Sequence, residues 1–352
     1  MQQRNGKKRQ ADFRNYNDDT EQNPAKKAKL DEVKATYEKG QQTQTLAHVE
    51  SRKKEYKQTD GYTDRNGNKV RMSVKDILKL LESICDSSDP DTSEAQSLHS
   101  LQTAESLKEH LDPNDLTKIK NIPVKDIFTQ ERWNQLPNAY KTKFKNATLA
   151  SLYSHITDWS WLPLIGLLHD MGKVLAHKRM GGLKQHEVVG DTFPVGAPFA
   201  PANVYYKDRF FEKNPDLDFS KSKSTGNRFG IYVKHCGFDE VEMSWGHDEY
   251  GAWLLENNIN HFPAEAFYLI KYHSFYPWHK GGAYSELAND KDYMTLPLLI
   301  FFQKSDLYSK RDTPYTKQEL KEKKEYYEQL TEKYIPCREP TPYNLRPGKM
   351  LL

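Results

Sequence analysis

An apolar helical segment that ends in a histidine and an aspartate constrains this chain more than any other feature. Residues 161–173 read Trp-Leu-Pro-Leu-Ile-Gly-Leu-Leu-His-Asp-Met-Gly-Lys, which places His169 and Asp170 at the end of an almost wholly apolar run. Burying a carboxylate in such a run is costly unless it is paired or binds a metal. Neighbouring helical side chains point about 100° apart, so His169 can bind one metal while Asp170 bridges to another. The alternative is that Asp170 caps the helix or pairs with Lys173.

Further candidate metal ligands lie in other apolar segments. They are His99, His247, His273 and Asp306, and Asp248 follows His247 directly. Each histidine taken alone is more often a hydrogen-bonded core residue than a ligand. Together with the first pair, however, they supply imidazoles and carboxylates without a thiolate, a combination that favours iron, manganese or zinc. Helical bundles commonly build two-metal sites from such side chains in their cores.

Composition sets broad limits on the class of protein. A chain of 352 residues can bury a sizeable site, and its net charge of +3 gives no strong bias toward nucleic acid or membrane surfaces. We find no apolar run of membrane-spanning length and no signal peptide. The three scattered cysteines form no Cys-x-x-Cys pair and suit a reducing compartment. We therefore expect a soluble cytoplasmic protein with no nucleic-acid or membrane partner, and a monomer, because no exposed heptad or apolar edge is evident.

The pattern along the chain predicts a mainly α fold with few or no strands. Residues 1–30 are polar and basic and predict a mostly disordered tail, in which residues 24–31 fit either a nuclear import signal or a solvated charge run. Residues 31–352 form the predicted catalytic domain, with a Lys-rich surface insertion of short helices at about 112–158. Ser73 is predicted to cap a helix. Later helices are expected near 161–177, 246–257, 263–274, 295–309 and 315–333, two of them with Pro263 or Pro297 near the first turn.

The order of these histidines and aspartates resembles the HD-domain superfamily, and longer strings resemble the inositol oxygenase family. The strings are residues 13–16 (Phe-Arg-Asn-Tyr), 169–173 (His-Asp-Met-Gly-Lys), 189–196 (Val-Gly-Asp-Thr-Phe-Pro-Val-Gly), 235–237 (His-Cys-Gly), 244–250 (Ser-Trp-Gly-His-Asp-Glu-Tyr), 273–279 (His-Ser-Phe-Tyr-Pro-Trp-His) and 306–308 (Asp-Leu-Tyr). The resemblance covers about residues 13–16 and 33–340. The link between His99 and His169 is longer than in that family, and the predicted insertion accounts for the difference.

The resemblance implies an HD-domain-like helical bundle around a mixed-valence di-iron centre. His99, His169 and Asp306 would hold one iron, His247 and His273 would hold the other, and Asp170 would bridge them. Asp248 is not a ligand in the family pattern and is interpreted as a supporting or surface residue. The implied reaction converts myo-inositol and dioxygen to D-glucuronate and water, as a step of inositol catabolism, with two irons as the only cofactors.

The same resemblance implies a set of residues that bind the polyol. These are Arg14, Asp86, Ser87, Ser88, Lys173, Gly190, Asp191, Ser274 and Lys310. Lys173 is also the expected catalytic proton-handling group, and a lysine beside two metals is expected to have a lowered pKa; the alternative is a salt bridge to Asp170 or Asp191. Whether Arg14 reaches the site depends on how residues 13–16 are placed over it.

Two other functions compete with this interpretation. A phosphohydrolase of the HD-domain superfamily would use the same His-Asp pair to activate water on a phosphate ester, but few Lys or Arg residues other than Lys173 and Lys310 lie near the ligand motifs. A non-catalytic nucleic-acid-binding protein would account for the basic tail. It would leave the metal-type ligands in the apolar segments without a role.

Overall fold

The fold is mainly α, as predicted. The computed structural model describes residues 24–58, 63, 68–89, 95–111, 119, 121–216, 228–258, 260–308, 315–336 and 349–351. The α-helices of this part are α1 Pro24–Thr43, α2 Leu46–Tyr56, α3 Val74–Leu81, α4 Gln96–Lys108, α6 Val124–Ile127, α7 Gln130–Gln135, α8 Asn138–Phe144, α9 Leu149–Leu152, α10 Trp161–Leu168, α12 His247–Glu256, α13 Ala264–Tyr272, α14 Tyr276–His279, α15 Asp290–Tyr308 and α16 Lys317–Tyr334. Two short strands, β1 Arg71–Ser73 and β2 Lys349–Leu351, pair antiparallel with Met72 opposite Met350.

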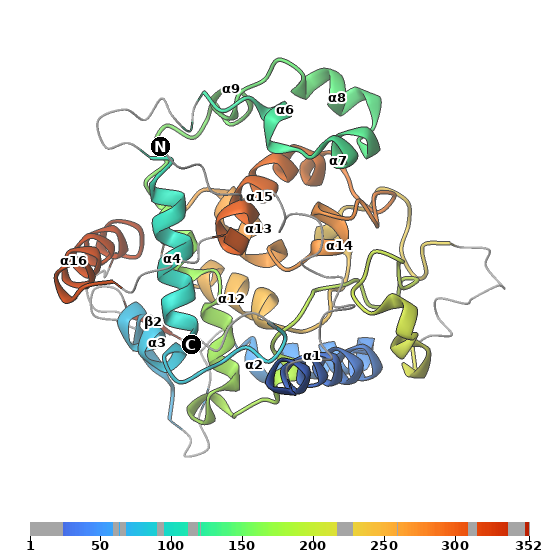
Figure 1. Cartoon of the computed structure of the whole chain (residues 1–352), viewed down its shortest axis with the longest axis horizontal. Helices are drawn as coiled ribbons and strands as arrows, with labels where there is room; N and C mark the ends of the chain where they lie inside the picture. Colours follow the sequence, from blue (N-terminus) through green and yellow to red (C-terminus); the bar gives the residue numbers. More distant parts are fainter. Residues whose placement is uncertain are drawn as a thin grey trace.

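The centre of the fold is built on close packing between α4 and α10. Every residue of α10 is buried, and the two helices cross at Gly166, where a Cβ would lie 2.7 Å from Leu107 Cδ1 and 3.0 Å from Ala104 Cα. Only glycine permits this approach without a shift of the backbone. Around this pair, α12 and α13 complete the helical bundle (Figure 1). The packing places His99 of α4 beside His169 at the end of α10.

The predicted helix over 161–177 changes character at the candidate ligands. The α-helix ends at Leu168, and residues Met171–Ala176 continue as the 3-10 helix η2. Gly172 lies in this 3-10 segment, and a Cβ there would lie 2.0 Å from the carbonyl oxygen of His247. The start of α12 therefore packs directly against the backbone of η2. This contact brings His247 next to the His169–Asp170 junction.

The helix that precedes Asp86 has the predicted N-terminal cap. Ser73 Oγ accepts from the backbone N–H of Asp76, and the Asp76 carboxylate accepts in return from the backbone N–H of Ser73. This reciprocal capping box satisfies two amide donors that a helix start otherwise leaves open. Ile77 and Leu81 bury the inner face of α3, so the turn that follows carries Asp86 inward.

The expected start of α15 near residue 295 is wrong. The helix begins at Asp290, and Pro297 lies inside it rather than in its first turn. A proline inside a helix removes a backbone donor and clashes with the preceding turn. Here the Tyr153 hydroxyl enters the helix at this point, since it donates to Met294 O at 2.8 Å and accepts from Leu298 N at 3.3 Å. A side chain from the predicted insertion thus gives hydrogen-bond partners to two backbone groups next to Pro297. Asp306 lies near the C-terminal end of the same helix.

Replacing Tyr153 with phenylalanine should destabilise the protein by about 1–3 kcal/mol, because a part-buried carbonyl and a buried amide would lose their common partner. The expected loss is measurable as a lower free energy of unfolding in urea. Tyr140→Phe is a suitable control, because the Tyr140 hydroxyl pairs with Asp290 in an exposed contact and its loss should change stability by less than about 1 kcal/mol. Equal stability of Tyr153→Phe and the wild type would show that the hydroxyl does not support α15.

Helices α6 to α9 lie within the predicted insertion and cover α14 and α15 on one side of the molecule (Figure 1). Their buried side chains, which include Val124, Ile127, Phe144 and Leu149, belong to the main hydrophobic core. At the other end of the sequence, α1 begins at Pro24, so residues 24–30 of the predicted tail are helical in the structure. The assignment of 112–158 as an insertion stays a prediction.

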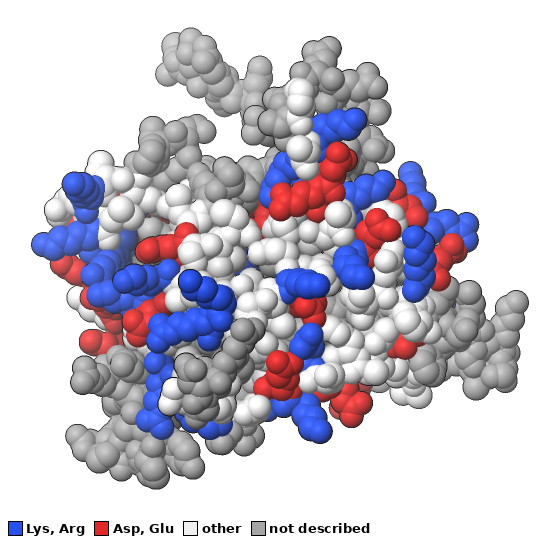
Figure 2. Space-filling model, turned by 90° about the horizontal axis from the view of Figure 1, so that it is seen from below, with Lys and Arg blue, Asp and Glu red and all other residues white. Residues whose placement is uncertain are grey.

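Charged side chains are mixed in sign on the face that Figure 2 presents, where lysines and arginines lie next to aspartates and glutamates. Ion pairs also join segments that are distant in the sequence, such as Lys34 with Asp208 at 2.5 Å. No helix in the described ranges is long and apolar enough to cross a membrane.

Candidate metal centre

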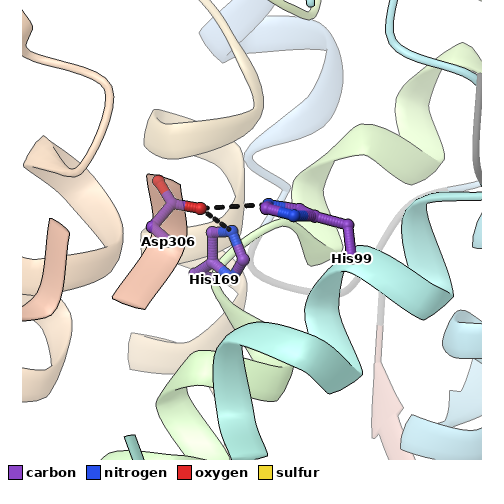
Figure 3. Close-up of side chains that lie close together, drawn as sticks. All are labelled: His99, His169 and Asp306. Carbon is purple, nitrogen blue, oxygen red and sulfur yellow. Dashed lines mark ion pairs between the residues drawn. The ribbon is translucent and has the colours of Figure 1, made fainter. Parts of the chain in front are cut away.

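Three side chains from three elements meet at one half of the centre (Figure 3). His99 from α4, His169 after α10 and Asp306 near the end of α15 form the group. Asp306 Oδ1 lies 3.0 Å from His99 Nε2 and 3.2 Å from His169 Nε2. Because His169 is 1% exposed, a cation at this position would be held largely out of water. Two imidazoles and a carboxylate that converge in this way could hold a metal ion.

A second half of the centre adjoins the first through Asp170. Its Oδ2 lies 3.3 Å from His169 Nε2 and 3.6 Å from His99 Nε2. Its Oδ1 lies 3.4 Å from His247 Nε2 and 3.6 Å from His273 Nε2. One carboxylate thus turns one oxygen toward each pair of histidines. This geometry is the one that a bridging ligand between two metal ions requires.

Backbone carbonyls orient the rings of His169, His247 and His273. Nδ1 of His169, His247 and His273 hydrogen-bonds to Gly166 O, Val188 O and Ile270 O at 2.7, 2.7 and 2.8 Å. Since a carbonyl only accepts, each Nδ1 carries a proton, and in the neutral ring Nε2 is then an unprotonated acceptor. Hydrogen bonding of the remote ring nitrogen is a regular feature of metal-binding histidines.

A cation resolves contacts that are otherwise unfavourable. His247 Nε2 lies 3.2 Å from His273 Nε2 and 2.7 Å from Asp248 Oδ1, so acceptor atoms face one another unless a proton or a metal ion lies among them. The residues therefore fit a metal at this position.

The charged groups of the first half also compensate one another. Burial acts to lower the pKa of His169, but the carboxylates of Asp170 and Asp306 outweigh it and raise that pKa to about 10. Burial conversely acts to raise the pKa of Asp306, while His169 and His99 hold it well below its usual range. The centre therefore combines ionised carboxylates with groups that compensate them, and a bound metal ion would take over that compensation.

The Lys173 ammonium forms part of the wall beside this centre. Its Nζ lies 2.8 Å from Asp86 Oδ2, 2.9 Å from Asp170 Oδ2 and 2.9 Å from Gln96 Oε1. The lowered pKa expected of this lysine beside two metals stays a prediction; among the protein groups alone, burial acts to lower its pKa, but Asp170 and Asp86 outweigh it and the pKa is raised. Of the two salt bridges that the sequence offered for Lys173, the one to Asp170 is present. The other carboxylate that pairs with Lys173 is that of Asp86 and not that of Asp191.

Asp248 is buried beside the centre, so its interpretation as a surface residue is excluded. It is 1% exposed. Its Oδ2 accepts from Thr192 Oγ1 at 2.8 Å and from Ser274 N at 3.2 Å, which leaves Oδ1 facing His247 and His273. Its position next to His247 in the sequence indicated that Asp248 could lie near the centre. The direction of its side chain, however, depends on the loop at Thr192 and on the residues after α13.

Most of the predicted polyol-binding residues surround one cavity next to the centre. Asp86, Ser88, Lys173, Gly190, Asp191 and Ser274 line it together with the six candidate histidine and aspartate ligands, and it encloses about 700 Å³ including its open mouth. Gly190 has φ of 106°, which is a conformation that favours glycine. The lining is rich in hydrogen-bonding groups, and a ligand with many hydroxyls would suit it.

The other three predicted residues are Ser87, Arg14 and Lys310. Ser87 hydrogen-bonds to Thr36 Oγ1 at 2.9 Å and to Gln185 Oε1, and it does not line this cavity. Arg14 and Lys310 lie outside the described residues, as does the segment 13–16. Sequence reasoning missed Tyr37 and Tyr276, which do line the cavity. Tyr37 donates to Asp191 Oδ1 at 2.9 Å, and no local pattern distinguishes it from other tyrosines, whereas Tyr276 lies in the string 273–279.

Fold and site together define a mainly α-helical protein with a buried His/Asp centre of the kind that holds metal ions. Comparison with known proteins then identifies the family. The family model described as "Myo-inositol oxygenase" matches residues 30–126 and 140–339. The chain belongs to the myo-inositol oxygenase family.

Relatives from distant organisms support this membership along nearly the whole chain. A "Probable inositol oxygenase" of Oryza sativa subsp. japonica is 35% identical over 326 residues, which cover 93% of this chain and 84% of the relative. An "Inositol oxygenase" of Dictyostelium discoideum is 33% identical over 92% of this chain and 88% of its own length. An "Inositol oxygenase" of Bos taurus is 36% identical over 87% of this chain and 86% of its own length.

Proposed function

We propose that this chain is a myo-inositol oxygenase that works through two iron ions, with His99, His169 and Asp306 holding one, His247 and His273 the other, and Asp170 bridging them. Family membership over most of the chain carries the activity. The observation that carries the two-metal assignment is the division of Asp170 between two pairs of histidines, at 3.3–3.6 Å from each Nε2. The reaction is the ring cleavage of myo-inositol by dioxygen to D-glucuronate and water.

Two bound irons would supply the electron-transfer and Lewis-acid chemistry of this four-electron oxidation. The protein side chains would position the substrate and manage its protons. Asp86, Ser88, Asp191 and Ser274 offer donors and acceptors around the cavity. A polyol presents only hydroxyl groups, so several such partners are needed to fix its orientation. Gly190 would let the backbone approach the ring closely.

Lys173 is the group best placed to hold or transfer a proton of a substrate hydroxyl. Its three N–H donors have three acceptors, Asp86, Asp170 and Gln96, at 2.8–2.9 Å. An ammonium with a raised pKa stays protonated at neutral pH, so it would serve as an acid once a substrate hydroxyl replaces one of these three acceptors. Asp86 keeps it in place, since Ser88 N and Oγ both donate to Asp86 Oδ1 at 2.7 and 2.6 Å.

A phosphohydrolase reaction has weaker support in the cavity. Phosphate esters are usually bound by several cationic side chains. Lys173 is the one lysine or arginine among the described residues of the lining, and two carboxylates already pair with it.

Anaerobic loading with ferrous iron, followed by partial oxidation and addition of myo-inositol and oxygen, tests the proposal. We expect about two irons per chain by elemental analysis, oxygen uptake, and glucuronate as product. Iron loading without uronic acid would leave the centre but refute the substrate. A chain that binds no iron would refute the proposed centre.

A further inference from the structure

Arg132 is a buried cation in a segment that the family model does not match. It lies in α7, within residues 127–139, which fall between the two matched ranges. The side chain is 3% exposed. Its Nε donates to the carbonyl oxygen of His279 at 3.2 Å, and its guanidinium carbon lies 5.0 Å from the centre of the Trp278 ring.

Burial of this guanidinium is energetically unfavourable. Within the described part of the chain no carboxylate pairs with Arg132, and its Nη2 has no hydrogen-bond partner. Burial lowers its pKa to about 10, a shift that Tyr293 only partly opposes. A buried charge without a counter-charge normally destabilises a fold. Such a residue is expected where function, rather than stability, requires it.

The contact of Arg132 leads directly to a candidate metal ligand. His279, whose carbonyl accepts from Arg132, directs its own ring Nε2 to the carbonyl oxygen of His273 at 3.0 Å. Gln303 Nε2 donates to the same oxygen at 2.5 Å. His273 ends α13, where backbone carbonyls have no partner within the helix. These side chains therefore fix the backbone from which the His273 imidazole extends.

The same turn also forms part of the cavity wall. Helix α14 runs from Tyr276 to His279, and Tyr276 lines the cavity beside the centre. A contact that holds the end of α14 thus bears on both His273 and Tyr276. Glycine at 282 helps α7 to approach this turn, because a Cβ there would lie 2.2 Å from Gln135 Oε1.

We propose that Arg132 is a positioning residue that holds the α14 turn and so keeps His273 aimed at the second metal position. The inference rests on the proposed function but goes beyond its ligand set, because it assigns a role to a segment outside the family match. It predicts that α7 is coupled to metal affinity and to the substrate pocket, although none of its side chains lines the cavity.

The decisive variant is Arg132→Met, which keeps an unbranched chain over Trp278 but removes the charge and the Nε donor. We expect about tenfold weaker retention of ferrous iron at one of two positions in anaerobic equilibrium dialysis, as for other residues that support metal ligands. KM for myo-inositol should rise as well. The melting temperature of the metal-free protein should stay equal or increase, because an unpaired buried charge has been removed. Arg132→Lys should recover part of the iron retention.

Lys143→Met is the matched control, because Lys143 is an exposed cation on the neighbouring helix α8; its iron retention and KM should equal those of the wild type. Wild-type iron retention and KM in Arg132→Met would overturn the positioning role. So would a melting temperature that falls together with iron retention, since Arg132 would then be a structural support only. A wild-type chain that holds no iron would overturn the metal centre itself, and this inference with it.

Discussion

Asp170→Asn is expected to reduce inositol cleavage by about 10³-fold or more and to lower the iron content below two per chain. The substitution keeps the shape of the side chain but removes the charge and one of the two acceptor oxygens that face the histidine pairs. Several kcal/mol of stabilisation by the metals would be lost with it. Iron content by elemental analysis and glucuronate formation under saturating myo-inositol measure the two effects separately.

Asp292→Asn provides a matched control for this substitution. Asp292 is also 1% exposed, but it accepts from Phe238 N and Asn289 N, each at 3.0 Å, and does not line the cavity. Its variant should change stability and leave iron content at the wild-type level. If Asp170→Asn retained two irons per chain and most of its activity, Asp170 would not be a bridging ligand.

Lys173→Met is expected to lower kcat by about 10²- to 10⁴-fold while iron content stays near that of the wild type. The range is the usual contribution of a positioned proton donor or acceptor. Loss of this cation also leaves the buried Asp86 without its partner at 2.8 Å, so some loss of stability should accompany it. Steady-state oxygen uptake, with iron content determined on the same samples, separates the catalytic loss from a loss of metal.

Two further variants sharpen this test. Lys57→Met removes a lysine that pairs with Glu249 away from the cavity, and its kcat should stay within about twofold of the wild type. In Lys173→Met combined with Asp86→Asn, stability should recover because no buried charge is left unpaired, whereas kcat should not. A kcat within a few-fold of the wild type in Lys173→Met would exclude Lys173 from proton handling.

The sequence alone was sufficient for the class of fold and for the composition of the centre. Apolar periodicity predicted a mainly α chain, and Ser73 predicted a helix start that the structure confirms. The imidazole and carboxylate groups could be recognised as candidate ligands because apolar segments rarely contain such groups without a compensating partner. Residue order and the longer strings then indicated the family, which the comparisons show.

Tertiary structure decided how those groups face one another. The sequence placed Asp170 beside His169, but only the packing of α4, α12 and α13 around that junction turns its two oxygens toward different histidine pairs. The raised pKa of Lys173 depends on Asp86, which is distant in sequence, and the burial of Asp248 depends on Thr192 and Ser274. Pro297 within α15 is tolerated because Tyr153 reaches it from another segment. Local sequence determines which side chains are present and which helices they form, whereas charge compensation and ligand direction arise from contacts between segments that only the folded chain brings together.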